Sequence, residues 1–465
     1  MSEPTGTAER KLSRIQAIQS CILAGLVSGT IIGSLNYSFG VFVPVWSEVF
    51  DDWSRTEINV AFSISQIVSS LFAPIAGHYM DKYSVRPVVS LSLVLSSSGY
   101  LVLSLTKSLP ILYIAYFLVG IGYPGAALLG PGKVVGQWFT GKRRGRVMGF
   151  VSSSNNIGGL IMTQLSTFII LKSNFRWAAA FFCILLAFLS IIYFIFIRLP
   201  ASPDKAVKVQ ANQSRTTSSL EDCDTEDVEV AEPQPKQKSC DRSLVNTRIV
   251  LTSPKFLLTT LGYFCAFWTY TGVFSNLIPA LIAEGFTEQE GANIQSAVAI
   301  SGIFSKLICG FLSERLGARI TLMLVMSVQA VTLIVFKLLQ GPGLGYWISC
   351  IIYGLSFGGV GVLLPLAALD VFGTQVFSRY YGMQNVTFIV SALLGPVAAG
   401  QSFDRSGSYK NAFLGAGGIF GLGILSLYLS GRLDFPEMAY ANPMENSSAQ
   451  PGKTETEETN KIDLQ

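Results

Sequence analysis

Lys306 is the residue of this sequence whose chemistry is hardest to account for by packing alone. It lies inside an otherwise apolar stretch, residues 296–312, that reads as part of a membrane-spanning helix. A charge in such a helix costs roughly 3 kcal/mol or more, so it needs a partner, an aqueous cavity or a substrate. The sequence therefore predicts an electrostatic anchor for an anion. The structural alternatives are a charge paired inside the protein and a lysine neutralised by burial.

Polar residues in other apolar segments could complete a binding cavity around this lysine. Each of them, taken singly, is more typical of a hydrogen bond between helices than of a ligand contact. We favour Tyr37, Asn156 and Asn276 among them. The predicted substrate site comprises Lys306, Tyr37, Asn36, Asn156, Asn276, Tyr270 and Gln384, and Gln66 is a further polar residue of this kind.

The sequence offers no constellation that would support covalent or metal chemistry. His78 is the single histidine, and the seven cysteines are scattered without a metal-ligand spacing. No nucleophile–base set is recognisable. We therefore expect no enzymatic activity and no cofactor. No basic run indicates nucleic-acid binding.

The elements that must position Lys306 are apolar segments of spanning length. Half of the 465 residues are hydrophobic and 13% are charged, whereas a soluble domain carries about 25% charged residues. The composition predicts an all-α protein of the lipid bilayer, with a transmembrane helix of about 20 residues in each segment. The twelve segments are residues 16–45, 58–79, 87–105, 111–138, 147–171, 177–197, 256–282, 292–313, 320–339, 346–372, 381–403 and 412–429.

Two polar regions divide this pattern into two bundles of six helices. Residues 199–250 and the tail, residues 431–465, are rich in polar and acidic side chains that cannot build a core, so we expect both to be largely disordered. The N-terminal bundle is predicted over residues 16–198, after a polar terminus of residues 1–15. The C-terminal bundle is predicted over residues 251–430.

The distribution of charge predicts the orientation of the helices. Basic residues gather in alternate loops, as at Lys82, Arg86, Arg315 and Arg319, and acidic residues such as Asp51 lie in the opposite loops. Cytoplasmic loops carry the excess of lysine and arginine. Both termini and the central linker are therefore expected in the cytoplasm, with the plasma membrane as the favoured location. We interpret Arg143 and Arg144 as topology anchors and expect Lys133 to face the cytoplasmic vestibule or the lipid headgroups.

An internal repeat relates the two bundles. Residues 77–86 (GHYMDKYSVR) match residues 310–319 (GFLSERLGAR) at an offset of 233, and the same offset pairs Arg146 with Arg379 and Gly149 with Gly382. Both loops read G-x-x-x-acid-base-x-small-x-Arg. Repeated six-helix halves of this kind form a transporter with its site between them. We predict that the loops latch one access state, through Gly77, Asp81, Lys82, Arg86, Gly310, Glu314, Arg315 and Arg319; the alternative is a role in topology alone.

These motifs resemble the major facilitator superfamily over nearly the whole membrane region. Within it, the chain is similar to the branch of monocarboxylate transporters and oxalate–formate exchangers. The similarity is carried by residues 38–42 (SFGVF), 138–144 (WFTGKRR), 175–177 (FRW), 370–373 (DVFG), 395–400 (GPVAAG) and 404–409 (DRSGSY). The resemblance implies that a cation four residues before the second loop glycine contacts the carboxylate of the substrate, and Lys306 holds that place before Gly310.

The chain also departs from this branch. Gly302 stands where proton-coupled members have an aspartate, Tyr37 lies close to the position of a lysine, and Thr387 and Phe388 lie nearest to a second lysine of the exchangers. Lys306 is therefore expected to be a lone anchor that suits one carboxylate better than two. Coupling to protons or to a counter-anion, and a single-span accessory protein, stay open.

The sequence predicts a secondary active or facilitative transporter of small organic anions, most plausibly monocarboxylates, that works by alternating access. One alternative is transport of a neutral or cationic solute with Lys306 in a structural role. Another is a membrane sensor built on a transporter fold.

Overall fold

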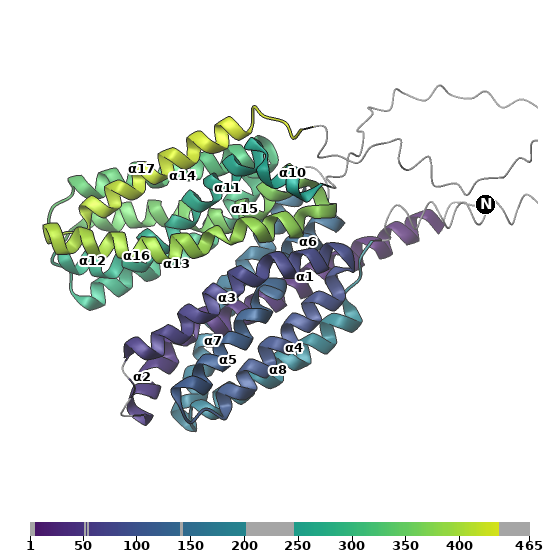
Figure 1. Ribbon diagram of the computed structural model, residues 1–465, viewed down its shortest axis with the longest axis horizontal. Coiled ribbons are helices and arrows are strands. Elements are labelled where there is room, and N and C mark those ends of the chain that lie inside the picture. Colours follow the sequence, from purple (N-terminus) through teal and green to yellow (C-terminus); the bar gives the residue numbers. More distant parts are fainter. Residues whose placement is uncertain (1–4, 51–52, 54, 140–142, 201–245, 437–465) are drawn as a thin grey trace, which may run out of the picture.

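The computed structural model describes residues 5–50, 53, 55–139, 143–200 and 246–436. The part of the chain before residue 201 forms one group of helices, coloured purple to blue. The part after residue 245 forms a second group, teal to yellow, that lies beside it (Figure 1). The expectations of disorder for the linker and the tail fall mostly outside the described residues. Residues 247–252 form the short helix α10.

Each group contains six passes of a length that suits a membrane. Several passes are assigned as consecutive helical pieces, with short π-helical or 3-10 segments labelled η. The first group comprises α1 (Thr5–Ile32), η1 (Gly33–Tyr37), α2 (Phe39–Val49), α3 (Arg55–Lys82), α4 (Val85–Ser104), α5 (Leu109–Tyr123), η2 (Pro124–Leu129), α6 (Gly130–Trp138), α7 (Arg144–Lys172) and α8 (Phe175–Phe196). The second comprises α11 (Pro254–Trp268), η4 (Thr269–Val273), η5 (Phe274–Asn276), α12 (Leu277–Ala283), α13 (Glu288–Leu316), α14 (Ala318–Leu338), α15 (Leu344–Asn385), α16 (Thr387–Ser406) and α17 (Lys410–Ser430).

Ten stretches of the described chain are long and apolar enough to cross a membrane. One of them, Leu344–Ser406, holds two passes, because the backbone reverses at Gly373, where φ is +73°. Tyr263 shows the reversal: its hydroxyl donates to the carbonyl of Leu364 and its ring lies 6.3 Å from that of Tyr381. With α7, whose 29 residues are also long enough, the passes number twelve. The predicted all-α membrane fold of two six-helix bundles is confirmed.

The helix ends follow local sequence signals. A capping box starts α13, in which Thr287 and Glu290 exchange hydrogen bonds. Side chains of Ser84, Asn174 and Ser253 cap the starts of α4, α8 and α11. The repeat places the loops 77–86 and 310–319 at one end of the molecule, which we call the basic end.

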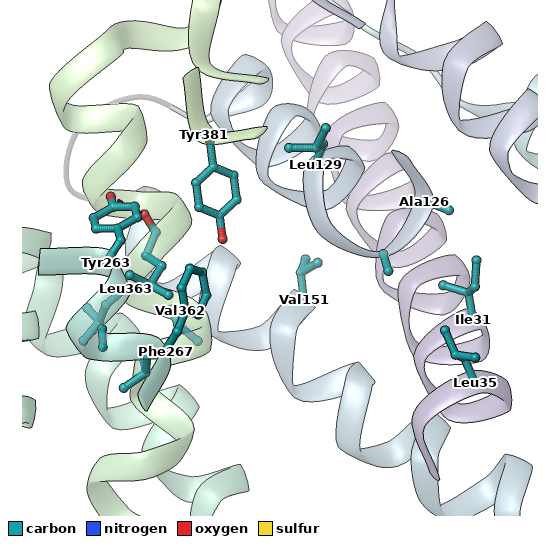
Figure 2. Packing of buried hydrophobic residues seen from close by; sticks show 14 of the residues in the cluster. Ile31, Leu35, Ala126, Leu129, Val151, Tyr263, Phe267, Val362, Leu363 and Tyr381 are labelled. Carbon is teal, nitrogen blue, oxygen red and sulfur yellow. Dashed lines mark hydrogen bonds between the residues drawn. The ribbon is translucent and has the colours of Figure 1, made fainter. Parts of the chain in front are cut away.

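Aromatic and aliphatic side chains form the core on either side of the seam between the halves. Figure 2 shows Tyr263, Phe267 and Tyr381 of the second half on one side, and Ile31, Leu35 and Val151 of the first half on the other. Two turns of π-helix, η1 and η4, interrupt the first pass of each half at corresponding places. Such turns shift the register of a helix and often mark functional sites.

The reversal between the tenth and eleventh passes depends on a glycine backbone. We expect Gly373→Ala to lower the free energy of unfolding by about 1 kcal/mol, because an L side chain disfavours positive φ even though no atom lies within 4 Å. Gly418→Ala in α17 is the matched control, with equally open space and no positive φ. Thermal unfolding in detergent measures both; equal midpoints for the two variants would contradict the expectation.

Candidate functional site

One face of α7 forms the contact surface between the halves. Gly145, Gly149, Ser152, Asn156 and Gly159 recur at spacings of four and three residues, so they lie along a single stripe. The first four of these residues contact α13 of the second half. Gly159 instead lies under the ring of Tyr37, from η1. The stripe runs from the basic end towards the middle of the membrane.

The glycines of this stripe bring two backbones into contact. A Cβ atom at Gly145 would lie 2.2 Å from the carbonyl oxygen of Gly310, and one at Gly149 would lie 2.6 Å from that of Lys306. Real side chains do not tolerate such distances, so glycine is required here. The close approach places the side chain of Lys306 directly against α7.

The ammonium of Lys306 is held by neutral oxygens of the opposite half. Nζ donates to the carbonyl of Ser152 at 3.1 Å and to Oδ1 of Asn156 at 2.5 Å. The residue is 8% exposed. Among the ion pairs of the described chain, none includes Lys306. An ammonium has three N–H donors, so one remains for a ligand, and its charge lacks a counter-ion.

The second seam repeats this geometry without the charge. A Cβ at Gly77 would lie 2.1 Å from the carbonyl oxygen of Ser378, and one at Gly382 would lie 2.5 Å from that of Ala73. At the repeat offset, Ala73 corresponds to Lys306. The two halves therefore meet through equivalent glycine contacts, and the position of Lys306 is a lysine in one seam and an alanine in the other.

The acids of the repeated loops cross between the halves in matching ways. Oδ2 of Asp81 accepts from the backbone N–H of Arg379 at 2.7 Å, and Oε1 of Glu314 accepts from the backbone N–H of Arg146 at 2.9 Å. Oε2 of Glu314 also pairs with Nε of Arg146 at 2.7 Å. Each carboxylate lies near the start of a helical stretch in the other half, where unpaired N–H groups favour negative charge.

The comparisons with known proteins agree with this arrangement. A model of the Major Facilitator Superfamily matches residues 23–396. The chain belongs to the Major Facilitator Superfamily. Two relatives are monocarboxylate transporter 7 of Homo sapiens, 26% identical over 81% of this chain and 79% of its own, and the oxalate:formate antiporter of Oxalobacter formigenes, 22% identical over 83% and 84%.

Solved structures of the superfamily share the fold at low identity. The transporter FucP in its outward conformation superposes with a TM-score of 0.63, at 13% identity over 88% of this chain and 98% of its own. The human organic anion transporter MFSD10 (TETRAN) superposes with a TM-score of 0.60, at 14% identity over 90% of this chain and 99% of its own. The protein is a multi-pass membrane transporter of this superfamily, similar in sequence to monocarboxylate transporters.

The structure corrects the expectation for Lys133, which faces neither a vestibule nor lipid headgroups. It is 3% exposed, and its ammonium pairs with Oδ1 of Asp81 at 2.6 Å. It also donates to the carbonyls of Thr374 and, at 3.0 Å, Gln375. A buried ammonium needs several acceptors to offset the loss of water. By bonding to Asp81 and to two carbonyls of the second half, Lys133 links the two halves.

Arg144 is a further bridge that the sequence did not reveal. Its guanidinium pairs with Asp370 of the second half, although the residue reads as a simple topology anchor. A cavity of about 460 Å³ opens beside this pair, lined by Gly145, Ser313, Glu314, Gly317, Ala318, Leu366 and Leu369 as well as the pair itself.

The remaining basic residues of the predicted latch contact their own halves. Arg86 donates to the carbonyl of Ile197 at 2.7 Å, and Arg319 packs against Gly431. Lys82 lies over the ring of Tyr83, and Arg315 over that of Phe311. Gly77, Asp81, Gly310 and Glu314 are thus the members of the predicted set with contacts across the seam.

Two of the predicted site residues, Asn156 and Tyr37, lie along α7 near Lys306. Asn156 contacts it, the ring of Tyr37 lies against Gly159, and Asn36 is adjacent to Tyr37. The others contact groups in the second half: Tyr270 packs edge-on to Phe357, Asn276 donates to Thr271, Gly272 and Ser275, and the buried Gln384 donates to Thr259.

Within the described ranges, His, Cys, Asp and Glu side chains nowhere gather in groups of three or more that could hold an ion.

The two acids at the basic end should control the closure of the seam. We expect Asp81→Asn with Glu314→Gln to raise the labelling rate of a cysteine placed at Ser313 by about tenfold, because a hydrogen bond to a charged group contributes about 1.5–3 kcal/mol. A membrane-impermeant thiol reagent and mass spectrometry give the rate. Asp434→Asn is the control, since its contact with Lys255 is exposed and 3.8 Å long. An unchanged rate in the double variant would contradict the closure.

Proposed function

We propose that the protein transports small organic anions, most plausibly monocarboxylates, and that Lys306 anchors the carboxylate. The observation that carries this proposal is the buried ammonium between the halves, which has neutral acceptors and no anionic partner among the described residues. Taking a charge out of water costs several kcal/mol unless an opposite charge repays it. A bound carboxylate would supply that charge and would use the free N–H.

The contacts at the basic end support alternating access. Asp81, Lys133, Arg144 and Glu314 all bond across the halves at this end. We propose that the basic end faces the cytoplasm, as the loop charges predict, and that this state is closed towards it. Opening to the cytoplasm would break these contacts, and Lys306 would then part from Ser152 and Asn156.

The relatives support the substrate class by their names. The human protein is called a monocarboxylate transporter and the bacterial one exchanges oxalate for formate. The proposal includes three further expectations from the sequence. They are coupling to protons or to a counter-anion, a location in the plasma membrane, and a single-span accessory partner. The alternative of a neutral or cationic solute is favoured by one observation, the two acceptors that Lys306 already has.

Substitution of Lys306 separates these two functions. Uptake of labelled lactate, pyruvate and oxalate into proteoliposomes should fall at least tenfold in Lys306→Ala and be largely kept in Lys306→Arg, because the positive charge is what binds the anion. Lys172→Ala is the control, since this lysine lies over the ring of Phe168 at the end of α7. Unchanged anion uptake in Lys306→Ala would favour the alternative.

Asn156→Asp tests the same charge by supplying a partner instead of removing the lysine. The new carboxylate would stand where Oδ1 of Asn156 now lies, 2.5 Å from Nζ of Lys306, and would neutralise it. We expect the KM for the anion to rise at least tenfold while the thermal midpoint is kept or raised, because the pair competes with substrate. Asn155→Asp, one position away on α7, is the control. A wild-type KM in Asn156→Asp would contradict the anchor role.

A further inference from the structure

Three uncharged polar side chains from separate passes of the first half form a connected network, which we call the amide–tyrosine cluster. Nδ2 of Asn36, in η1, donates to the hydroxyl of Tyr123 at the end of α5 at 2.9 Å. Nε2 of Gln66, in α3, donates to Oδ1 of Asn36 at 2.8 Å. All three residues are partly exposed, although each lies well inside a stretch of membrane-spanning length.

The amide–tyrosine cluster leaves one acceptor and one donor open. Both polar atoms of the Asn36 amide are used within the cluster. Within the described chain, Oε1 of Gln66 has no donor and the O–H of Tyr123 has no acceptor. Polar atoms without partners at this depth are costly unless they face water or a ligand. The partial exposure of the cluster therefore indicates an open, hydrated surface rather than a contact between helices.

Tyr37 connects the cluster to the part of α7 that holds Lys306. Along α7, Gly159 follows Asn156 by three residues, and the ring of Tyr37 lies so close to Gly159 that a Cβ there would be 2.7 Å from it. In η1, Tyr37 directly follows Asn36 of the cluster. Tyr37 thus stands between the cluster and the partner of Lys306.

The path from the ammonium to the cluster covers one turn of α7 and the width of a phenol ring, on the order of 10 Å. This exceeds the length of a two- or three-carbon acid. A solute that bridges both groups must be elongated. Its far end must also be neutral, because the cluster consists of amides and a phenol and offers no charge to a second carboxylate.

We propose that Asn36, Gln66 and Tyr123 form a second subsite, which binds a neutral hydroxyl, carbonyl or amide group at the far end of an elongated monocarboxylate held by Lys306. This rests on the proposed anion transport. The O–H of Tyr123 donates to the solute and Oε1 of Gln66 accepts from it. A hydroxyl, which donates and accepts, satisfies both groups at once.

Two acids that differ by one hydroxyl test this subsite. Dissociation constants of hexanoate and 6-hydroxyhexanoate are measured on the purified full-length protein in nanodiscs. We expect the hydroxy acid to bind about tenfold more tightly, because its hydroxyl pairs with Gln66 and Tyr123, whereas the alkyl end of hexanoate displaces water from these groups and leaves them unpaired. Tyr123→Phe and Gln66→Leu should each bring the ratio of the two constants towards one. Tyr193→Phe is the control, since that hydroxyl is buried in α8 without a partner.

The outcomes separate this subsite from the anion anchor. Lys306→Ala should weaken both acids together and leave their ratio unchanged, because it removes the shared carboxylate contact. A wild-type ratio near one, or a ratio that survives Tyr123→Phe and Gln66→Leu, overturns the second subsite and leaves the anchor standing. Wild-type protein that binds neither acid overturns the proposed function and the subsite with it.

Discussion

A single ammonium group between two bundles, held by neutral oxygens, is the constraint on which the site depends. Ser152 and Asn156 hold Lys306 in place without cancelling its charge. An aspartate at the same place would form an internal ion pair and leave little attraction for a ligand. Neutral acceptors lower the cost of burial while the charge stays available. The glycine stripe of α7 makes this contact feasible, because it brings the backbones within reach of one lysine side chain.

A symmetric backbone carries an asymmetric set of charges. The glycine contacts of the two seams match, and so do the bonds from Asp81 and Glu314 to backbone N–H groups. The side chains between them differ. One seam has Lys306 without an anionic partner, and the other has Ala73 at the equivalent position and Lys133 paired with Asp81. The repeat thus supplies the two-state scaffold, while the unpaired cation supplies one specific place for an anion.

The sequence predicted those features that depend on periodicity and on the repeat. Apolar segments predicted the passes, and the offset of 233 residues predicted that Asp81 and Glu314 would behave alike. Contacts that depend on which helix lies opposite could not be predicted in this way. Lys133 was placed wrongly because its partners lie far along the chain. The link from Asn36 to Tyr123 likewise exists only once the helices have packed.

The central claim is that the ammonium of Lys306 contacts the transported anion. The most direct measurement is a structure of the protein with a bromine-labelled monocarboxylate, in which anomalous scattering locates the ligand. The account predicts a carboxylate oxygen about 3 Å from Nζ of Lys306, at hydrogen-bond distance, with the rest of the ligand directed towards Tyr37. A ligand bound elsewhere, with Lys306 still bonded to Ser152 and Asn156 alone, would contradict it.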